Sequence, residues 1–272
     1  MISPELLFWY GLAAKMAMTA IVVVITSIVV ERSGAFVGAM IAALPTAAGV
    51  AYVILAIEHP VSFIAASALG TVATTAAVSI FCLVYAALAQ RHGLLVCLSV
   101  SLLIWFIAAG LLRLIDWTPL TAVILNIVVF AITIPLSLGY RTSGPPRKFI
   151  RTAFDIPMRA FAAGAVVATV TTASYSIGSF ASGMFAVFPI VMCSSVVILH
   201  PRVGGKATAS MLAHAQVALI GLALGFLVVH FLAEPLGAWW AISAGIAASV
   251  AWSALLLLIR ASATRRASQV AP

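Results

Sequence analysis

The polar side chains that could carry chemistry are few in this sequence, and they lie singly inside long apolar runs. His214 and Gln216 are two residues apart in one run, Ser194 lies in the run before it, and Asn126 lies in an earlier one. A histidine held inside a membrane can relay protons, because its ordinary pKa lies near neutrality. The alternative is that these side chains only hydrogen-bond neighbouring helices. We therefore treat all four as candidate contacts along a substrate pathway.

Lys15 is the clearest basic candidate for a position at membrane depth. A buried cationic side chain inside a membrane is a functional candidate by default. If the first transmembrane helix begins near Ala13, however, Lys15 reaches the outer surface along its own alkyl chain. Both interpretations stay open at the level of sequence.

The sequence lacks the residue patterns of familiar enzymes. No Asp or Glu falls inside a predicted span, and there is no Walker loop, HExxH motif or histidine-rich cluster. An intramembrane hydrolase would need Ser194 or Ser195 beside His214, and no spacing supports that pairing. The cysteines are scattered without a Cys-x-x-Cys pair, at Cys82, Cys97 and Cys193. We expect no enzymatic activity, no metal site and no other cofactor.

Two proline-containing stretches provide a frame for the polar candidates. Residues 34–45 read GAFVGAMIAALP and recur without a gap as residues 178–189, GSFASGMFAVFP, at a constant offset (178 − 34 = 144 and 189 − 45 = 144). Each proline removes an N–H and crowds the carbonyl four residues earlier, so each helix should bend or break there. Small residues such as Ser182 flank both prolines and permit close helix packing. We expect Pro45 and Pro189 to line a central pathway, the alternative being two simple packing kinks.

Composition places the chain in a membrane. Of its 272 residues, 64% are hydrophobic and only 7% are charged, whereas soluble domains carry about 25% charged residues. Several apolar runs exceed the roughly 20 residues that cross the hydrocarbon core as a helix. Helices satisfy their own backbone groups in lipid, and the alternating segments of a transmembrane barrel are not evident. We predict an all-α integral membrane protein.

Hydropathy predicts about nine transmembrane helices. The expected spans cover residues 6–30, 34–57, 61–89, 94–112, 119–138, 159–177, 180–199, 205–232 and 236–259.

The basic residues then segregate to one side of the membrane. With nine spans, the side of the membrane that holds the C-terminus receives 14 − 2 = 12 of the 14 Lys and Arg residues. The opposite side holds only Lys15 and Arg113. The positive-inside rule places the C-terminus in the cytoplasm and the N-terminus outside, in a bacterial inner membrane. The net charge of +8 therefore indicates topology and contact with anionic membrane lipid, not nucleic-acid binding.

The repeat extends beyond the proline stretches. Lys15 matches Arg159 at the same offset of 144, and Trp252 precedes Arg260 by the same eight residues that separate Trp105 from Arg113 (260 − 252 = 113 − 105). Spans one to four thus correspond to spans six to nine, and the single helix between them inverts the second copy. We divide the chain into a first repeat (1–116), a linking helix with a basic cytoplasmic loop (117–157), and a second repeat with a short basic tail (158–272). Inverted repeats with broken helices are typical of secondary transporters, whose sites lie near the midplane.

The second repeat resembles the GlpM-type small inner-membrane proteins. Residues 182–189, SGMFAVFP, are similar to that family's Gly-Leu-x-x-x-Phe-Pro helix, and residues 200–204 resemble its following His and Gly. The first repeat departs from the pattern, with Leu44 in place of Phe before Pro45. The family consists of single four-helix units and is linked to exopolysaccharide (alginate) production. The resemblance therefore implies a fused, inverted duplication of such a unit, and it implies no substrate.

These patterns favour a transporter or permease of unknown substrate, which would be a small or lipid-linked molecule. Without a nucleotide-binding domain, transport would be driven by a gradient. The alternative is a non-transporting membrane scaffold or accessory protein, for example in envelope polysaccharide production. Assembly as a homo-oligomer is left open.

Overall fold

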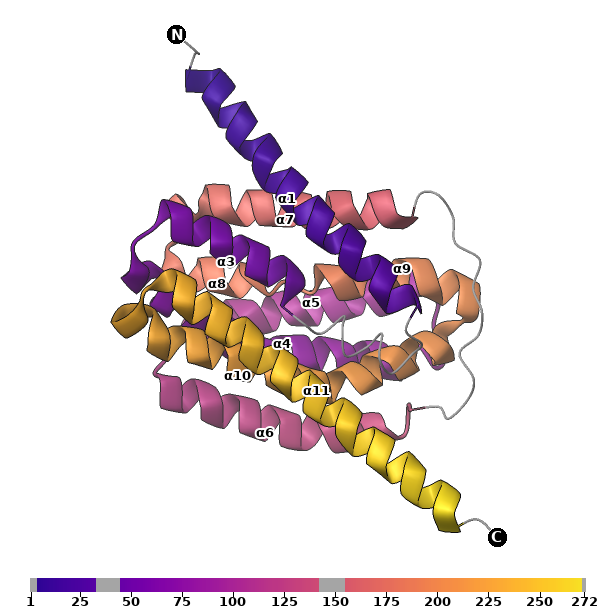
Figure 1. The fold of residues 1–272 in the computed structure, drawn as a ribbon. Helices are drawn as coiled ribbons and strands as arrows, with labels where there is room; N and C mark the ends of the chain where they lie inside the picture. Colours follow the sequence, from indigo (N-terminus) through magenta and orange to yellow (C-terminus); the bar gives the residue numbers. More distant parts are fainter. Residues whose placement is uncertain (1–3, 33–44, 142–154, 271–272) are drawn as a thin grey trace.

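The computed structural model describes residues 4–32, 45–141 and 155–270, with side chains described for 9–25, 45–141 and 155–262. Throughout these residues the regular structure is helical and contains no strand. The helices form one bundle in which most axes run in roughly the same direction (Figure 1). They are α1 (Pro4–Arg32), α3 (Thr46–Glu58), α4 (Val61–Leu88), α5 (Leu94–Leu112), α6 (Pro119–Leu138), α7 (Asp155–Ile177), α8 (Ser179–Ala186), α9 (Ile190–Val203), α10 (Gly205–Leu236) and α11 (Ala238–Val270).

Within the described residues, seven helical stretches are long and apolar enough to cross a membrane: 61–88, 94–112, 119–138, 155–177, 179–203, 205–236 and 238–262. The fifth stretch contains both α8 and α9. Two shorter apolar helices, 9–25 and 46–58, precede them. The chain is thus an all-α protein with multiple potential membrane spans. The count of nine stays a prediction, because residues 34–44 of the second expected span lie outside the described residues.

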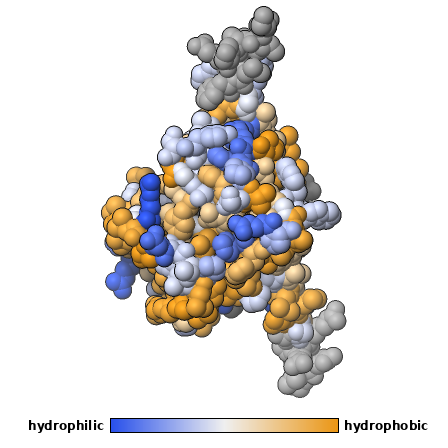
Figure 2. All heavy atoms as spheres, turned by 90° about the vertical axis from the view of Figure 1, so that its left-hand side faces the viewer, coloured by the Kyte–Doolittle hydropathy of each residue, from blue (hydrophilic) through white to orange (hydrophobic). Residues whose placement is uncertain are grey.

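Helix α4 lies at the centre of the bundle and packs against α10, α8, α5 and α6. In α4, 72% of the most apolar segment is buried inside the bundle, whereas in α5 and in α11 only 22% of the corresponding segment is buried. The outer helices expose large apolar side chains such as Leu95, Ile127 and Leu258. Viewed onto the end that is on the left in Figure 1, hydrophilic patches lie within the end face and hydrophobic residues surround them (Figure 2). This distribution suits a bundle with apolar sides in lipid and polar ends in water.

Several helix contacts occur as matched sets. Helix α1 packs on α7, and α4 packs on α10. Helix α4 packs on α5, and α10 correspondingly packs on α11. Helix α1 packs on α3, and α7 packs on α9. Helix α5 packs on α9, and α11 packs on α3. Exchanging α1, α3, α4 and α5 for α7, α9, α10 and α11 therefore leaves this set of contacts unchanged.

Helices α4 and α8 approach so closely that only glycine fits at their crossing. A Cβ added to Gly183 would lie 1.8 Å from the Ser67 carbonyl oxygen, and one added to Gly70 would lie 2.3 Å from that of Phe180. The contact is reinforced by the Ser67 hydroxyl, which donates to the carbonyl of Ser179 at 2.9 Å. The small residues allow the backbones of the two helices to touch, as is common between membrane helices. The first half of the broken helix is thereby held firmly against the central helix.

Candidate functional site

Pro45 and Pro189 adopt nearly the same backbone conformation. Pro45 has φ −74° and ψ 49°, and Pro189 has φ −74° and ψ 45°. Each directly precedes a helix, α3 or α9, and each carbonyl accepts from the N–H four residues on, at 2.6 Å from Gly49 and 2.8 Å from Cys193. The two prolines thus begin two helices in the same way.

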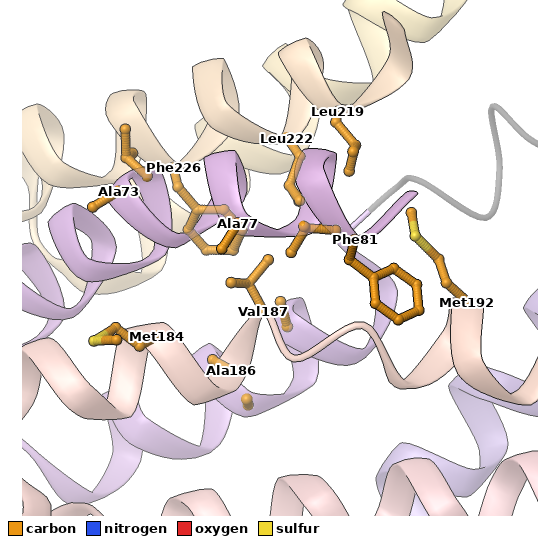
Figure 3. Packing of buried hydrophobic residues seen from close by; sticks show 14 of the residues in the cluster. Ala73, Ala77, Phe81, Met184, Ala186, Val187, Met192, Leu219, Leu222 and Phe226 are labelled. Atoms are coloured by element: carbon orange, nitrogen blue, oxygen red, sulfur yellow. The ribbon is translucent and has the colours of Figure 1, made fainter. Parts of the chain in front are cut away.

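The helical chain is broken between α8 and α9 over residues 187–189. Pro189 has no N–H to donate to the carbonyl of Phe185, so that carbonyl accepts instead from the N–H of Phe188, at 3.0 Å. Because α8 and α9 together form one potential membrane span, the break falls inside it. Val187 points from the break toward Ala77 of α4 (Figure 3). The expected break is therefore present before Pro189, while residues 34–44, its counterpart before Pro45, lie outside the described residues.

A cavity of about 50 Å³ lies between the two prolines. Both of them line it, together with the first turns of α3 and α9, the α8–α9 break, and side chains of α4 and α10. Its walls are almost wholly apolar, and they include Leu219, Leu222 and Met192. This volume accommodates a few water molecules and is well below the roughly 300 Å³ of pockets for drug-sized ligands.

Polar groups at the cavity come mainly from the backbone. The first N–H groups of a helix have no acceptor within that helix and carry partial positive charge, and the first turns of both α3 and α9 border the cavity. Thr46 adds a hydroxyl that is buried and has no hydrogen-bond partner among the described residues. The cavity thus presents hydrogen-bonding capacity although its side chains are mostly apolar.

A chain of hydroxyl groups holds α3, α4 and α8 together. Thr71 donates to the carbonyl of Gly183 at 2.7 Å, so its contact of 2.7 Å with Tyr52 places the tyrosine hydroxyl as donor. Thr71 and Tyr52 are fully buried. Sequence analysis did not select them, because Thr and Tyr in apolar runs carry no spacing that distinguishes a cross-link from packing.

Ser182 and Ser194 are bonded within their own helices. The Ser182 hydroxyl donates to the carbonyl of Gly178 at 2.8 Å, and the Ser194 hydroxyl donates to that of Val191 at 3.0 Å. Both side chains are buried, and neither lines the cavity between the prolines. They satisfy local backbone carbonyls, as Ser commonly does within helices.

Gln216 connects three helices. Its Oε1 accepts from the Ser79 hydroxyl at 2.5 Å, and its Nε2 donates to the Ser79 carbonyl at 2.9 Å. Ser79 also lies 2.7 Å from the hydroxyl of Thr133 on α6, which must donate because the Ser79 proton is already used. All three side chains are buried. We name Ser79, Thr133 and Gln216 the polar clasp.

His214 lies outside this clasp. Its Nδ1 is 2.7 Å from the carbonyl oxygen of Ser210, which can only accept a hydrogen bond, so Nδ1 carries the proton. The side chain is half-buried, and Arg141 bonds the neighbouring carbonyl of Ala213 at 3.3 Å. His214 and Gln216 are therefore close in sequence but have different surroundings.

Asn126 joins α6 to α4. Its Nδ2 donates to the carbonyls of Val72 and Ala122, both at 2.8 Å. Its Oδ1 is buried without a hydrogen-bond partner in the described part of the chain. The side chain therefore links two helices and does not line the cavity.

Lys15 is paired with the carboxylate of Glu58. Its Nζ lies 2.6 Å from Oε1 of Glu58, and the two side chains are only 16% and 23% exposed. Lys15 therefore anchors α1 to the end of α3. The next residue, His59, bonds Ser174 of α7 at 2.7 Å, and partial burial lowers the pKa of His59, with Glu58 opposing and Lys15 adding to the shift.

A second ion pair joins α7 to the end of α9. Arg202 forms a two-point contact with Asp155, in which Nη2 donates to Oδ1 at 2.7 Å and Nη1 donates to Oδ2. Sequence analysis missed both pairs, although a signal was present: Glu58 and Arg202 are separated by the repeat offset (202 − 58 = 144).

Among the residues whose placement is described, no group of three or more His, Cys, Asp or Glu side chains could hold a metal ion. No protein-family model, curated protein or solved structure matches the chain. The resemblance to GlpM-type proteins accordingly stays a prediction. What the helices define is a class, a multi-pass α-helical membrane protein.

Proposed function

We propose that this protein is a transporter of the bacterial inner membrane, which moves a small or lipid-linked molecule through the region between Pro45 and Pro189. One observation carries the proposal: the two prolines of the repeated stretch, 144 residues apart, line the same cavity. Paired discontinuous helices around a midplane site are the arrangement used by many secondary transporters. The proposal includes no enzymatic step and no nucleic-acid partner.

The proposal includes an inverted repeat of four plus one plus four helices. The shared backbone conformation of Pro45 and Pro189 supports it, as do the contact sets that survive exchange of the two copies. Helices α3 and α9 also extend from the middle of the bundle in opposite directions (Figure 1). With nine spans, the N-terminus would be outside and the C-terminus in the cytoplasm.

Opening would require movement at the α8–α9 break. The cavity of about 50 Å³ is too small for most metabolites, so within this proposal the structure is a closed form. A substrate would have to separate α3 and α9 from α4 and α10. The residues at the break lack regular helical bonds and can change backbone angles at lower cost than residues inside a helix. Substrate contacts would come from the cavity walls. Gln216 and Asn126 would act by holding neighbouring helices together, whereas Ser182, Ser194 and His214 bond carbonyls on their N-terminal side in the closed form.

Accessibility of position 46 to water tests this proposal without knowledge of the substrate. In a background lacking the native cysteines, Thr46→Cys should react with a membrane-impermeant maleimide applied to intact cells and to inverted vesicles. Replacing both prolines, Pro45→Ala with Pro189→Ala, should make the helices continuous and lower the reaction rate by about tenfold, since it removes the opening movement. The matched control is Pro135→Ala, which removes a proline inside α6 that does not line the cavity. An introduced thiol that never reacts from either side would contradict a transport pathway.

A non-transporting scaffold is the second candidate, because the cavity is small and apolar and each candidate serine is bonded within its own helix. Such a protein would assist other membrane components, for example in envelope polysaccharide production, as the resemblance to GlpM-type proteins suggests. It would keep the thiol introduced at position 46 unreactive under all conditions. The same experiment therefore separates the two candidates.

A further inference from the structure

Two ion pairs lie at matched places in the bundle and have opposite polarity. At the end of α3, the acidic residue Glu58 binds the basic Lys15 of α1. At the end of α9, the basic residue Arg202 binds the acidic Asp155 of α7. Glu58 and Arg202 occupy equivalent positions of the two proline-led helices, because both lie 13 residues after the proline (58 − 45 = 202 − 189 = 13).

The two pairs are far from the cavity and on opposite sides of it. Helix α3 has 13 residues and α9 has 14, so each pair lies about 20 Å from the proline at 1.5 Å per residue. Helices α3 and α9 run in opposite directions from the middle of the bundle (Figure 1). The distance between the pairs is thus about 40 Å, comparable to a bilayer with its headgroup regions.

Both pairs are shielded from solvent to a large extent. The exposed fractions of the side chains are 16% and 23% for Lys15 and Glu58, and 27% and 6% for Arg202 and Asp155. Charges in such positions are screened less by salt than surface charges. Removing Lys15 also leaves the partly buried Glu58 carboxylate without its contact to Nζ. Each pair can therefore hold its helix end closed, yet it is breakable.

We propose that these pairs are two gates, which close the pathway at opposite membrane faces and open alternately. Lys15–Glu58 is the outer gate, and Asp155–Arg202 is the cytoplasmic gate. Breaking one pair releases the far end of one proline-led helix from the first helix of its own repeat, while the pair at the other face stays closed. At α3, the bond of His59 to Ser174 of α7 must also yield. This inference rests on the proposed transport function, because it assumes a pathway through the cavity.

The two gates differ in strength. Arg202 binds both oxygens of Asp155, whereas Lys15 binds Oε1 of Glu58 and Oε2 is buried without a hydrogen-bond partner in the part of the chain that is described. Two-point guanidinium–carboxylate contacts are stronger and more specific than single contacts of an ammonium group. The outer gate therefore opens more readily, and without substrate a thiol introduced at position 46 is reached more easily from outside than from the cytoplasm.

Cysteine reactivity at position 46 tests the gates one at a time. Adding Glu58→Gln to Thr46→Cys should raise the reaction rate with external maleimide roughly five- to tenfold and leave the rate in inverted vesicles unchanged. Adding Arg202→Gln should raise the rate in inverted vesicles and leave the external rate unchanged. The matched controls are Glu234→Gln and Arg91→Gln, which neutralise exposed charges outside both pairs and should change neither rate.

Charge exchange separates gating from loss of folding. Lys15→Glu with Glu58→Lys, and Asp155→Arg with Arg202→Asp, should restore the slow rates on the respective sides. Two results would overturn the assignment of the ion pairs as gates and leave the proposed pathway intact. In both, the introduced thiol reacts in the Thr46→Cys parent, but either neither gate variant changes a rate or both variants raise the rate on the same side. If that thiol is unreactive in the parent and in every variant, the transport function itself is overturned.

Discussion

At the scale of single residues, polar side chains in this bundle connect helices more than they line a path. Gln216 uses both ends of its amide on Ser79, and Ser79 in turn holds Thr133. In lipid an unbonded amide has no water to replace its partners, so such a clasp holds three helices in one arrangement. The clasp thus holds α6 and α10 against α4.

The polar clasp predicts a stability effect at Gln216. Gln216→Leu keeps the approximate volume but leaves the Ser79 carbonyl without its side-chain donor and removes the link to α10, which should cost about 1–2 kcal/mol of unfolding free energy. Unfolding of the protein in detergent measures this effect. Ser194→Ala is the matched control, because its hydroxyl bonds a carbonyl of its own helix. Equal stability of the two variants would argue against the clasp.

At the scale of elements, the crossing of α4 and α8 depends on the absence of side chains. The Gly183 Cα faces the Ser67 backbone, and the Gly183 carbonyl accepts from Thr71 at 2.7 Å. Close approach and hydrogen bonding therefore support each other at one contact. The remainder of the broken helix, α9, contains no glycine that could make such a contact with α4, which leaves the second half freer to move than the first.

The glycine contact predicts a steric effect of one methyl group. Gly183→Ala would place its Cβ 1.8 Å from the Ser67 oxygen, so α8 must shift and the Thr71 bond must lengthen, at about 1–3 kcal/mol. Thermal unfolding in detergent should show a lower midpoint. Gly110→Ala on α5 is the control, because no atom lies within 4 Å of its added Cβ and alanine is the better helix former. A neutral Gly183→Ala would show that the helices are not in this contact.

At the scale of the whole molecule, the arrangement has two ends that resemble each other with reversed direction. The start of α1 and the end of α11 lie at opposite corners of the bundle (Figure 1). Each end also contains one ion pair between a first helix and a proline-led helix. These features suit a molecule that must open to either side of a membrane from one central region.

The proposed inverted repeat predicts the location of the termini. Reporter fusions should place the N-terminus outside and the C-terminus in the cytoplasm, because the nine spans of the proposal are an odd number. Fusions after residue 59 and after residue 203 should likewise report opposite sides. Both termini on one side of the membrane would remove the inversion and, with it, the argument that both prolines serve one pathway.

The amino-acid sequence was enough to predict the helical membrane class, most helix boundaries and the break before Pro189. Those features depend on one segment at a time: lipid requires each helix to satisfy its own backbone, and a proline lacks an N–H wherever it stands. The expected span over residues 94–112, for example, agrees with α5 at both ends.

Which polar side chains meet depends on how the helices pack in three dimensions. Ser79 and Gln216 are 137 residues apart, and Lys15 reaches Glu58 only because α1 packs on α3. The residue pattern within one helix cannot identify such a partner on another helix, because the partner depends on how the two helices rotate and cross. His214 and Gln216 have different surroundings although they are two residues apart, and Pro45 and Pro189 line one cavity although they are 144 residues apart. Residues close in sequence need not be close in the packed bundle, and distant residues can meet there.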